Sequence, residues 1–145
     1  MAERVQSYKN HARLLPAFHF FVIPVLLVNV INAIRHVYQV QSQHYAFELV
    51  VAVALLMTAF LARIQALAAQ DRVIRLEMRL RLRGLLPADL HGSINSLTTA
   101  QLVALRFAGD AEITEIVRDV LAGKLAKQKE IKLRVKDWQA DWQRV

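Results

Sequence analysis

The hydrophobic pattern is dominated by a run from Ala46 to Arg83 that contains neither glycine nor proline. Its first part, AFELVVAVALLMTAFLARIQALAAQ, is almost wholly apolar, whereas its second part, DRVIRLEMRLRLR, mixes apolar residues with arginine. As a helix rising about 1.5 Å per residue, the run would be about 57 Å long, well beyond the roughly 30 Å hydrocarbon core of a bilayer. It therefore predicts a membrane span over about 46–66 that continues into water as a stalk. Gly84, in the left-handed conformation, and Pro87 are expected to end the helix.

A second apolar run covers residues 16–34 and predicts another span. A polar start precedes it, but the run is long and bulky and lacks a small-x-small cleavage site. We therefore interpret it as a retained helix rather than a signal peptide. Pro16 suits the first helical turn, and Pro24 inside the run predicts a kink.

The distribution of Lys and Arg predicts the orientation of this hairpin. Three such residues precede the first run and six lie from Arg63 to Arg83, but the connection at 35–45 has only one. Positive charge favours the cytoplasmic side, so both termini are expected there. The fold class is therefore all-α. We expect a membrane hairpin within 1–69, followed by a cytoplasmic stalk and three short helices within 70–145.

The helix after the stalk has the clearest start signal in the chain. Thr98 and Gln101 have the spacing of a capping box, and Leu97 precedes the cap as a hydrophobic staple requires. This predicts a loop over the stretch after Gly84 and then a helix over 99–108 that stops at Gly109.

The last part of the chain predicts two further helices. Asp110 is the expected N-cap of a helix over 111–122, which Gly123 would end. The tail admits a strand, because apolar residues alternate with charges from Ile131 to Val135, or a helix. The helical interpretation is favoured because an apolar seam has spacings of 4, 3, 4 and 3; its members are Ile131, Val135, Trp138, Trp142 and Val145.

Composition excludes several kinds of chemistry. The chain has no cysteine, so it can form no disulfide, thiolate metal site or thiol nucleophile. No Ser/His/Asp order or Gly-rich phosphate loop occurs, and the spacing of His11 and His19 is weak for a metal. We therefore expect no enzyme activity, no cofactor and no metal. The net charge of +7 suits anionic lipid, and the chain lacks a nucleic-acid recognition motif.

Polar residues near or within the two spans are candidate functional groups, because such groups are costly in a membrane and usually face protein or water. One interpretation is a structural clamp between Arg35 and Glu48. The alternative is a polar path through an oligomer. His19 is expected to hydrogen-bond to the second span rather than to relay protons. The candidates are His19, Asn29, Asn32, Arg35 and Glu48.

Small residues recur every four positions in the second span, and such a row allows another helix to approach closely. The row either holds the first span or forms a subunit interface. It consists of Ala54, Thr58, Ala62 and Ala66.

The stalk combines an arginine stripe with two apolar strips. The stripe is either a solvated face or a site for anionic lipid headgroups. Asp71–Arg75 and Glu77–Arg81 have the spacing of ion pairs. Two apolar strips need two partners, one in the same chain and one in a neighbouring subunit. The stripe comprises Arg72, Arg75, Arg79 and Arg83; the strip predicted to contact the neighbour comprises Ile74, Met78, Leu82 and Leu85; the other comprises Val73, Leu76 and Leu80.

Four separated stretches resemble an uncharacterised family of small bacterial membrane proteins with two spans. They are Gln6 to Phe21, Gln70 to Arg81, Leu97 to Ile113, and the terminal W-x-x-D-x-x-x-V from Trp138 to Val145. The resemblance implies two membrane helices and a cytoplasmic helical region in the bacterial inner membrane. It implies no activity, substrate or site residue.

These features predict a homo-oligomeric membrane scaffold with a cytoplasmic helical platform. The alternative is an oligomeric channel or small-solute conduit, since a two-span subunit cannot enclose a pore alone.

Overall fold

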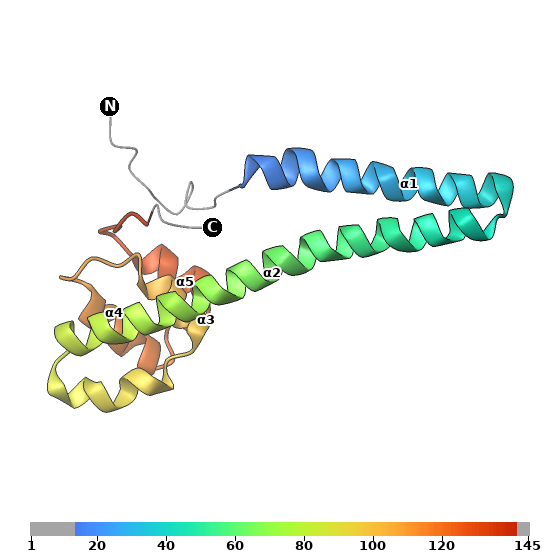
Figure 1. Ribbon diagram of the computed structural model, residues 1–145. Coiled ribbons are helices and arrows are strands. Elements are labelled where there is room, and N and C mark those ends of the chain that lie inside the picture. The colour runs from blue at the N-terminus through green and yellow to red at the C-terminus, as the bar shows by residue number, and fades with distance from the viewer. Residues whose placement is uncertain (1–13, 142–145) are drawn as a thin grey trace. The chain divides into compact units, whose positions relative to one another are not determined.

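The computed structural model describes residues 14–141, and most of these are helical (Figure 1). No strand occurs among them apart from one isolated bridge, so the predicted all-α class is confirmed. The described chain forms two compact units, residues 14–67 and residues 68–141, which divide within helix α2. The elements are η1 (Phe18–Val22), α1 (Ile23–Val40), α2 (Gln43–Leu85), η2 (Ala88–Ser96), α3 (Thr99–Leu105), α4 (Ile113–Leu121) and α5 (Gln128–Arg134).

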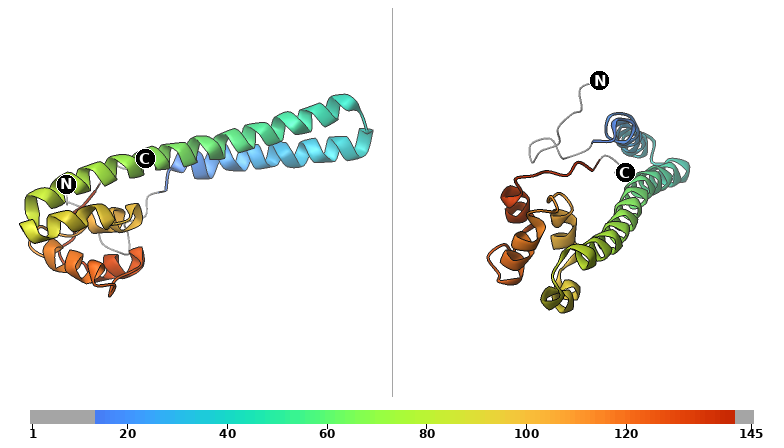
Figure 2. Two further views of the ribbon diagram at one scale, coloured as in Figure 1. Left: turned by 90° about the horizontal axis from the view of Figure 1, so that it is seen from below. Right: turned by 90° about the vertical axis from the view of Figure 1, so that its left-hand side faces the viewer.

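The first unit is a helical hairpin in which α1 and the N-terminal part of α2 lie side by side and antiparallel (Figures 1 and 2). The predicted polar connection is much shorter than expected, because α1 continues to Val40 and α2 begins at Gln43. Gln41 ends α1 in the left-handed conformation with φ of 45°. The hydroxyl of Ser42 then accepts a hydrogen bond from the His44 N–H at 3.2 Å. Two residues thus suffice to reverse the chain.

The irregularity expected at Pro24 appears just before it, as the π-helical turn η1. There the N–H of Ile23 bonds to the carbonyl of Phe18, five residues earlier. Proline has no N–H to donate and crowds the preceding turn, so a widened turn there accommodates it.

Both helices of the hairpin are long and apolar enough to cross a membrane. The most apolar 18-residue windows have mean hydropathies of 1.8 in Phe18–Val40 and 2.2 in Gln43–Leu85. Only 0% and 6% of these windows are buried within the structure. A core helix of a water-soluble protein would have most of such a window buried. The apolar side chains of the hairpin therefore point outward.

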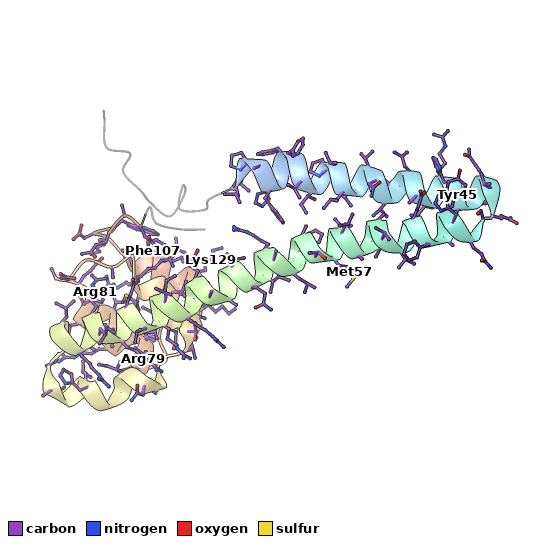
Figure 3. The ribbon with its side chains drawn as sticks, in the orientation of Figure 1. Tyr45, Met57, Arg79, Arg81, Phe107 and Lys129 are labelled. Carbon is purple, nitrogen blue, oxygen red and sulfur yellow. The ribbon has the colours of Figure 1, made fainter. Side chains whose placement is uncertain are left out.

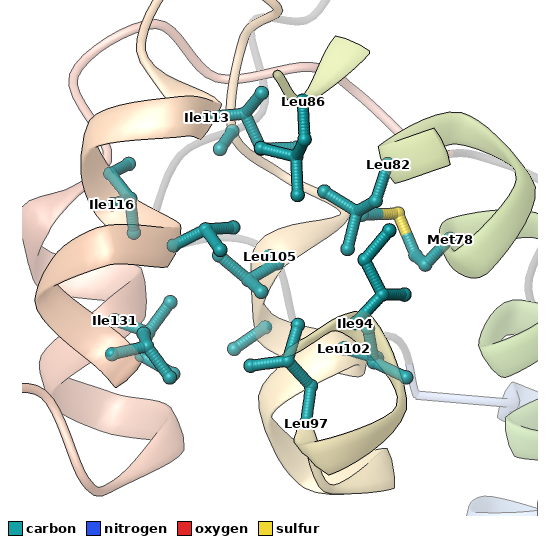
Figure 4. Packing of buried hydrophobic residues seen from close by; sticks show 14 of the residues in the cluster. Met78, Leu82, Leu86, Ile94, Leu97, Leu102, Leu105, Ile113, Ile116 and Ile131 are labelled. Carbon is teal, nitrogen blue, oxygen red and sulfur yellow. The ribbon is translucent and has the colours of Figure 1, made fainter. Parts of the chain in front are cut away.

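The second unit is built around a hydrophobic core to which every one of its helices contributes (Figure 4). The C-terminal part of α2 supplies Met78 and Leu82, and α3 supplies Leu102 and Leu105 against them. Burial of each such side chain stabilises the fold by about 1.5–3 kcal/mol. The other fully buried aliphatic residues are Ile94, Ile113, Ile116, Val117 and Ile131.

The end of α2 differs from the prediction. Gly84 lies within the helix, which continues to Leu85, and Gly84 is not among the described residues with positive φ. Pro87 begins the next element instead, in an extended conformation. The predicted loop is also wrong, because residues 88–96 form the 3₁₀ helix η2 and bury Ile94 in the core.

The capping box at the start of α3 is confirmed. The Thr98 hydroxyl accepts the N–H of Gln101 at 3.2 Å, and the Gln101 carbonyl oxygen accepts the N–H of Thr98 at 2.8 Å. Leu97, the predicted staple residue, is buried in the core together with Leu102. The helix ends at Leu105, three residues earlier than predicted, because the following residues turn into an extended segment.

Helix α4 starts later than predicted and is not capped by Asp110. Its N-cap is Glu112, whose side chain makes no capping bond. Its end agrees with the prediction, because Gly123 has a φ of 76°. The N–H of Lys124 bonds to the carbonyl of Asp119 and that of Gly123 to the carbonyl of Val120, which together form a Schellman motif.

The tail forms a helix only over Gln128–Arg134, so the predicted seam is interrupted. Ile131 and Val135 are buried as predicted. Trp138 lies in an extended segment paired with Ala108 rather than on a helix. Trp142 and Val145, the last members of the predicted seam, lie outside the described residues.

Candidate functional sites

A polar groove lies between α1 and α2 near the connection of the hairpin. It has a volume of about 480 Å³ and is open to the surface. The small side chains of Ala33 and Ala52 are the buried residues of the hairpin and allow the helices to approach closely. Around them, the polar lining consists of Asn29, Asn32, His36, His44 and Glu48. The groove therefore brings three predicted residues, Asn29, Asn32 and Glu48, together and adds two histidines.

Glu48 pairs within its own helix rather than across the hairpin. Its Oε1 lies 3.2 Å from Nε2 of His44, one turn earlier. Arg35 is exposed and forms no ion pair with any of residues 14–141. The predicted Arg35–Glu48 clamp is therefore wrong. The physical reason is the short connection, which places His44 in α2 at i,i+4 spacing from Glu48.

His19 also bonds within its own segment. Its Nδ1 lies 2.9 Å from the carbonyl oxygen of Leu15 and 3.2 Å from the Leu15 N–H. The expected hydrogen bond to the second span is thus wrong, because a polar group four residues away is the nearer partner. The contact with α2 at this level is aromatic instead, with Phe18 and Phe60 edge to face at a centroid distance of 6.4 Å.

The row of small residues on α2 does not serve chiefly to hold α1. Ala54, Thr58 and Ala62 are exposed, and only Ala66 is partly buried. Helix α1 lies instead against a different face of α2, on which Ala52 is only 2% exposed. The Thr58 hydroxyl donates to the carbonyl of Ala54 at 2.8 Å, so it needs no other polar partner. The interpretation that this row holds the first helix is wrong for Ala54 and Thr58, whereas Ala62 and Ala66 line a pocket together with Phe18 and Val22.

The stalk face predicted to contact a neighbouring subunit is the core of the chain's own second unit. Ile74, Met78 and Leu82 are buried and Leu85 is packed against them. They cannot be the primary oligomer contact, because α3 and the other short helices already cover them. The opposite strip is the uncovered one: Val73, Leu76 and Leu80 are 54%, 62% and 61% exposed.

The arginine stripe lies on the surface of the stalk. Arg72, Arg75 and Arg83 are exposed and Arg79 is partly buried. None of the four forms an ion pair with the part of the chain that the structure describes. The predicted pair between Asp71 and Arg75 is also absent there. The stripe therefore offers four guanidinium groups to an anionic partner.

Arg81 joins the stalk to the rest of the second unit (Figure 3). Its Nη2 lies 2.5 Å from Oδ1 of Asp110, and the predicted pairing with Glu77 is wrong. Nη2 also donates to the carbonyl of Ala108 at 2.7 Å, and Nη1 donates to that of Arg106 at 3.3 Å. Asp110 was predicted as a helix cap, and local sequence contains no signal that it would meet a residue 29 positions earlier.

The C-terminal segment is tied to the turn between α3 and α4. The N–H of Gly109 donates to the carbonyl of Asp137 and the N–H of Gln139 to that of Phe107, each at 2.9 Å. The rings of Phe107 and Trp138 are in contact, with their centroids 4.8 Å apart and their planes tilted by 34°. A side chain on Gly109 would collide with Asp137, so glycine is required here for close approach rather than as a helix stop.

Beside this segment, Arg106 is buried in a pocket of about 280 Å³. Its Nε lies 3.3 Å from Oδ2 of Asp141, and Glu77 and Arg81 also line the space. Two cations and two carboxylates leave little net charge to select an ion. Within residues 14–141, no three His, Asp or Glu side chains lie close enough together to hold a metal ion.

Comparison with known proteins gives a family but no activity. No curated protein and no solved structure matches the chain. The model of a family of unknown function, DUF6526, matches residues 1–145. The chain belongs to this family of unknown function, DUF6526.

Proposed function

We propose that the protein is an integral membrane scaffold. In this proposal the hairpin of residues 14–67 crosses the cytoplasmic membrane of a bacterium and displays the second unit in the cytoplasm. The observation that carries it is the outward-facing apolar surface of the hairpin. Phe20, Phe21, Phe47 and Val50 are each more than 60% exposed, and many other aliphatic residues are at least 38% exposed.

Such a surface is far more compatible with lipid than with water. Monomeric soluble proteins rarely expose contiguous apolar patches beyond a few hundred Å². Each large apolar side chain removed from water contributes about 1.5–3 kcal/mol. The backbone groups of α1 and α2 are hydrogen-bonded within each helix, which is a requirement for any segment inside a bilayer. The hydroxyl of Thr58 meets the same requirement through Ala54.

Charge distribution supports cytoplasmic termini. The two-residue connection and its flanks carry one Lys or Arg, whereas the regions before α1 and after the apolar part of α2 are arginine-rich. Arg72 follows Ala66 by six residues, or about 9 Å of helix. The first guanidinium groups of the stripe are thus placed to contact anionic headgroups, which attract juxtamembrane basic residues by about 1 kcal/mol each.

The scaffold is proposed to act as a homo-oligomer. The second unit is a folded platform with its own core, yet Val73, Leu76 and Leu80 remain uncovered on it. This uncovered strip is the feature of the second unit that supports assembly.

Membrane extraction and particle mass test this proposal together. The protein is expected to stay in the membrane pellet after alkaline carbonate washing and to leave it only with detergent. Light scattering with detergent correction should then give a multiple of 16.5 kDa. Release by carbonate would refute the hairpin insertion. A purified particle containing a single chain would refute the oligomer.

A conduit is a second candidate, favoured by the polar groove alone. Asn29, Asn32 and Glu48 line a space of about 480 Å³ within an otherwise apolar hairpin. Polar groups at membrane depth usually mark a solute path or a partner. Purified protein in liposomes should then conduct ions, and conductance should fall in Glu48→Gln. Tight liposomes containing wild-type oligomer would eliminate the conduit and leave the scaffold.

A further inference from the structure

The uncovered strip of the stalk has the spacing of a coiled-coil seam. Ala69, Val73, Leu76 and Leu80 lie on α2 at intervals of 4, 3 and 4 residues, and all four are exposed. Apolar residues that alternate between intervals of 3 and 4 occupy the a and d positions of a heptad repeat. Val73 and Leu80 then take a positions, and Ala69 and Leu76 take d positions. Arg83, the next d position, ends the apolar seam.

This seam is not an edge of the core. At 100° per residue, the seam and the buried face of Ile74, Met78 and Leu82 lie on opposite sides of the helix. The short helices of the second unit cover only the buried face. The uncovered side needs a partner with an apolar seam of its own.

Charges beside the seam identify that partner. In the heptad frame, Arg72 and Arg79 occupy g positions and Glu77 occupies an e position. In a parallel pair, a g residue meets the e residue five positions later on the other helix. Arg72 therefore meets Glu77 of the second copy, and symmetry forms this pair twice. Both residues are exposed, and neither forms an ion pair within residues 14–141.

The same positions disfavour an antiparallel pair. There g positions face g positions, so Arg72 would meet Arg79 of the other copy and like charges would repel. The seam thus distinguishes the two orientations. One a/d pair of the seam, Val73 at a and Leu76 at d, has the β-branched and leucine combination that favours two strands over three or four, and Leu80 occupies the second a position.

We propose that the stalk pairs with a second copy of this chain as a parallel, in-register, two-stranded coiled coil. The contact is centred on Val73, Leu76 and Leu80 and is flanked by two Arg72–Glu77 ion pairs between the copies. Four layers form a short coiled coil. The inference rests on the proposed function in one respect: insertion of both copies in one membrane supplies the parallel orientation and a high effective concentration.

Disulfide trapping tests this arrangement in the full-length protein, because the chain has no cysteine of its own. Leu76→Cys lies at a d position, where the two Cβ atoms face each other across the symmetry axis. Arg75→Cys is the matched control. Arg75 immediately precedes Leu76 and is also exposed, but it points away from the seam. Both variants are oxidised in isolated membranes, and the same samples are washed with carbonate.

Leu76→Cys is expected to give a covalent dimer, with Arg75→Cys yielding about tenfold less. In the Leu76→Cys background, Arg72→Glu or Glu77→Arg alone should lower the dimer yield about fivefold, because each replaces two attractions with two repulsions. The two charge changes together should restore it. A structural role within one chain would not produce this rescue.

Equal trapping of Leu76→Cys and Arg75→Cys in protein that resists carbonate would overturn the inference while leaving the membrane hairpin intact. A failure of the double charge exchange to recover trapping would overturn it as well. A covalent product of another mass would show that a different protein contacts the seam, and it would also overturn the inference. Trapping that persists in carbonate-released protein would support the seam and refute the membrane insertion instead.

Discussion

Arg81 on α2 and Asp110 before α4 form an ion pair across 29 positions of sequence, with Nη2 2.5 Å from Oδ1. Arg81 also donates to the carbonyl oxygens of Ala108 and Arg106. A single guanidinium therefore satisfies several acceptors in the turn between α3 and α4. It holds that turn against the stalk helix.

Arg81→Lys is expected to destabilise the second unit by about 1–2 kcal/mol, because an ammonium group cannot reproduce the planar set of donors. Thermal unfolding of the detergent-solubilised chain, followed by Trp fluorescence, measures the change. Arg83→Lys is the control, since Arg83 is exposed and should shift stability by less than about 0.5 kcal/mol. Equal effects of the two substitutions would show that the contacts of Arg81 with Asp110 and the two carbonyl groups do not contribute specifically to stability.

Thr98→Ala is expected to cost about 1 kcal/mol, because it removes the acceptor for the Gln101 N–H at the start of α3. The neighbouring Thr99→Ala should matter much less. The same unfolding measurement distinguishes them. If Thr99→Ala were the more harmful change, the capping box would contribute little to stability.

The start of α3 and the end of α4 could be predicted because short sequence patterns determine them. Thr98 with Gln101, and Gly123 after an apolar helix, specify their hydrogen bonds within a few residues. The all-α class and the long α2 followed from composition and periodicity over many residues. These features depend little on the rest of the chain.

The roles of Asp110 and Gly109 were harder to predict because each depends on a residue far away in the sequence. Asp110 has the local character of an N-cap, but its carboxylate pairs with Arg81, and Glu112 is the N-cap of α4. Gly109 resembles a helix stop, yet glycine is needed there because the Asp137 side chain lies against it. Both apolar strips of the stalk have helical spacing, so sequence could not decide which one α3 would cover. The structure assigns the core to Ile74, Met78 and Leu82.

Gly109→Ala is expected to destabilise the chain by about 1–3 kcal/mol, because the added methyl group would overlap the Asp137 side chain. Asp137→Ala in the same chain should recover part of this loss. Gly92→Ala is the matched control, since nothing lies within 4 Å of the position and its φ is not positive. A harmless Gly109→Ala would show that the C-terminal segment does not pack against this turn in solution.

A pH dependence is expected from Glu130. Its carboxylate accepts the N–H of Lys127 at 3.0 Å and that of Ala126 at 2.9 Å. The backbone bond from Lys127 is the main cause that lowers the pKa of Glu130 from its ordinary 4.5. A lowered pKa stabilises the folded state above the ordinary value, and this contribution disappears as pH falls through the folded-state pKa.

Glu130→Gln should therefore lower the melting temperature more at pH 7 than in acid below the folded-state pKa. Melting curves of both proteins across this range measure the difference. A constant gap between them at every pH would contradict the assignment.

The central claim is that the hairpin crosses the membrane with its connection outside and the second unit in the cytoplasm. Single cysteines at Ser42 and Ser93 test it directly, because Ser42 lies in the connection and Ser93 in η2. In intact cells treated with a membrane-impermeant thiol reagent, we expect labelling at position 42 only. Position 93 should react once the cells are opened. Labelling at 93 but not at 42 in intact cells would reverse the orientation, and equal labelling of both only after lysis would contradict the membrane hairpin.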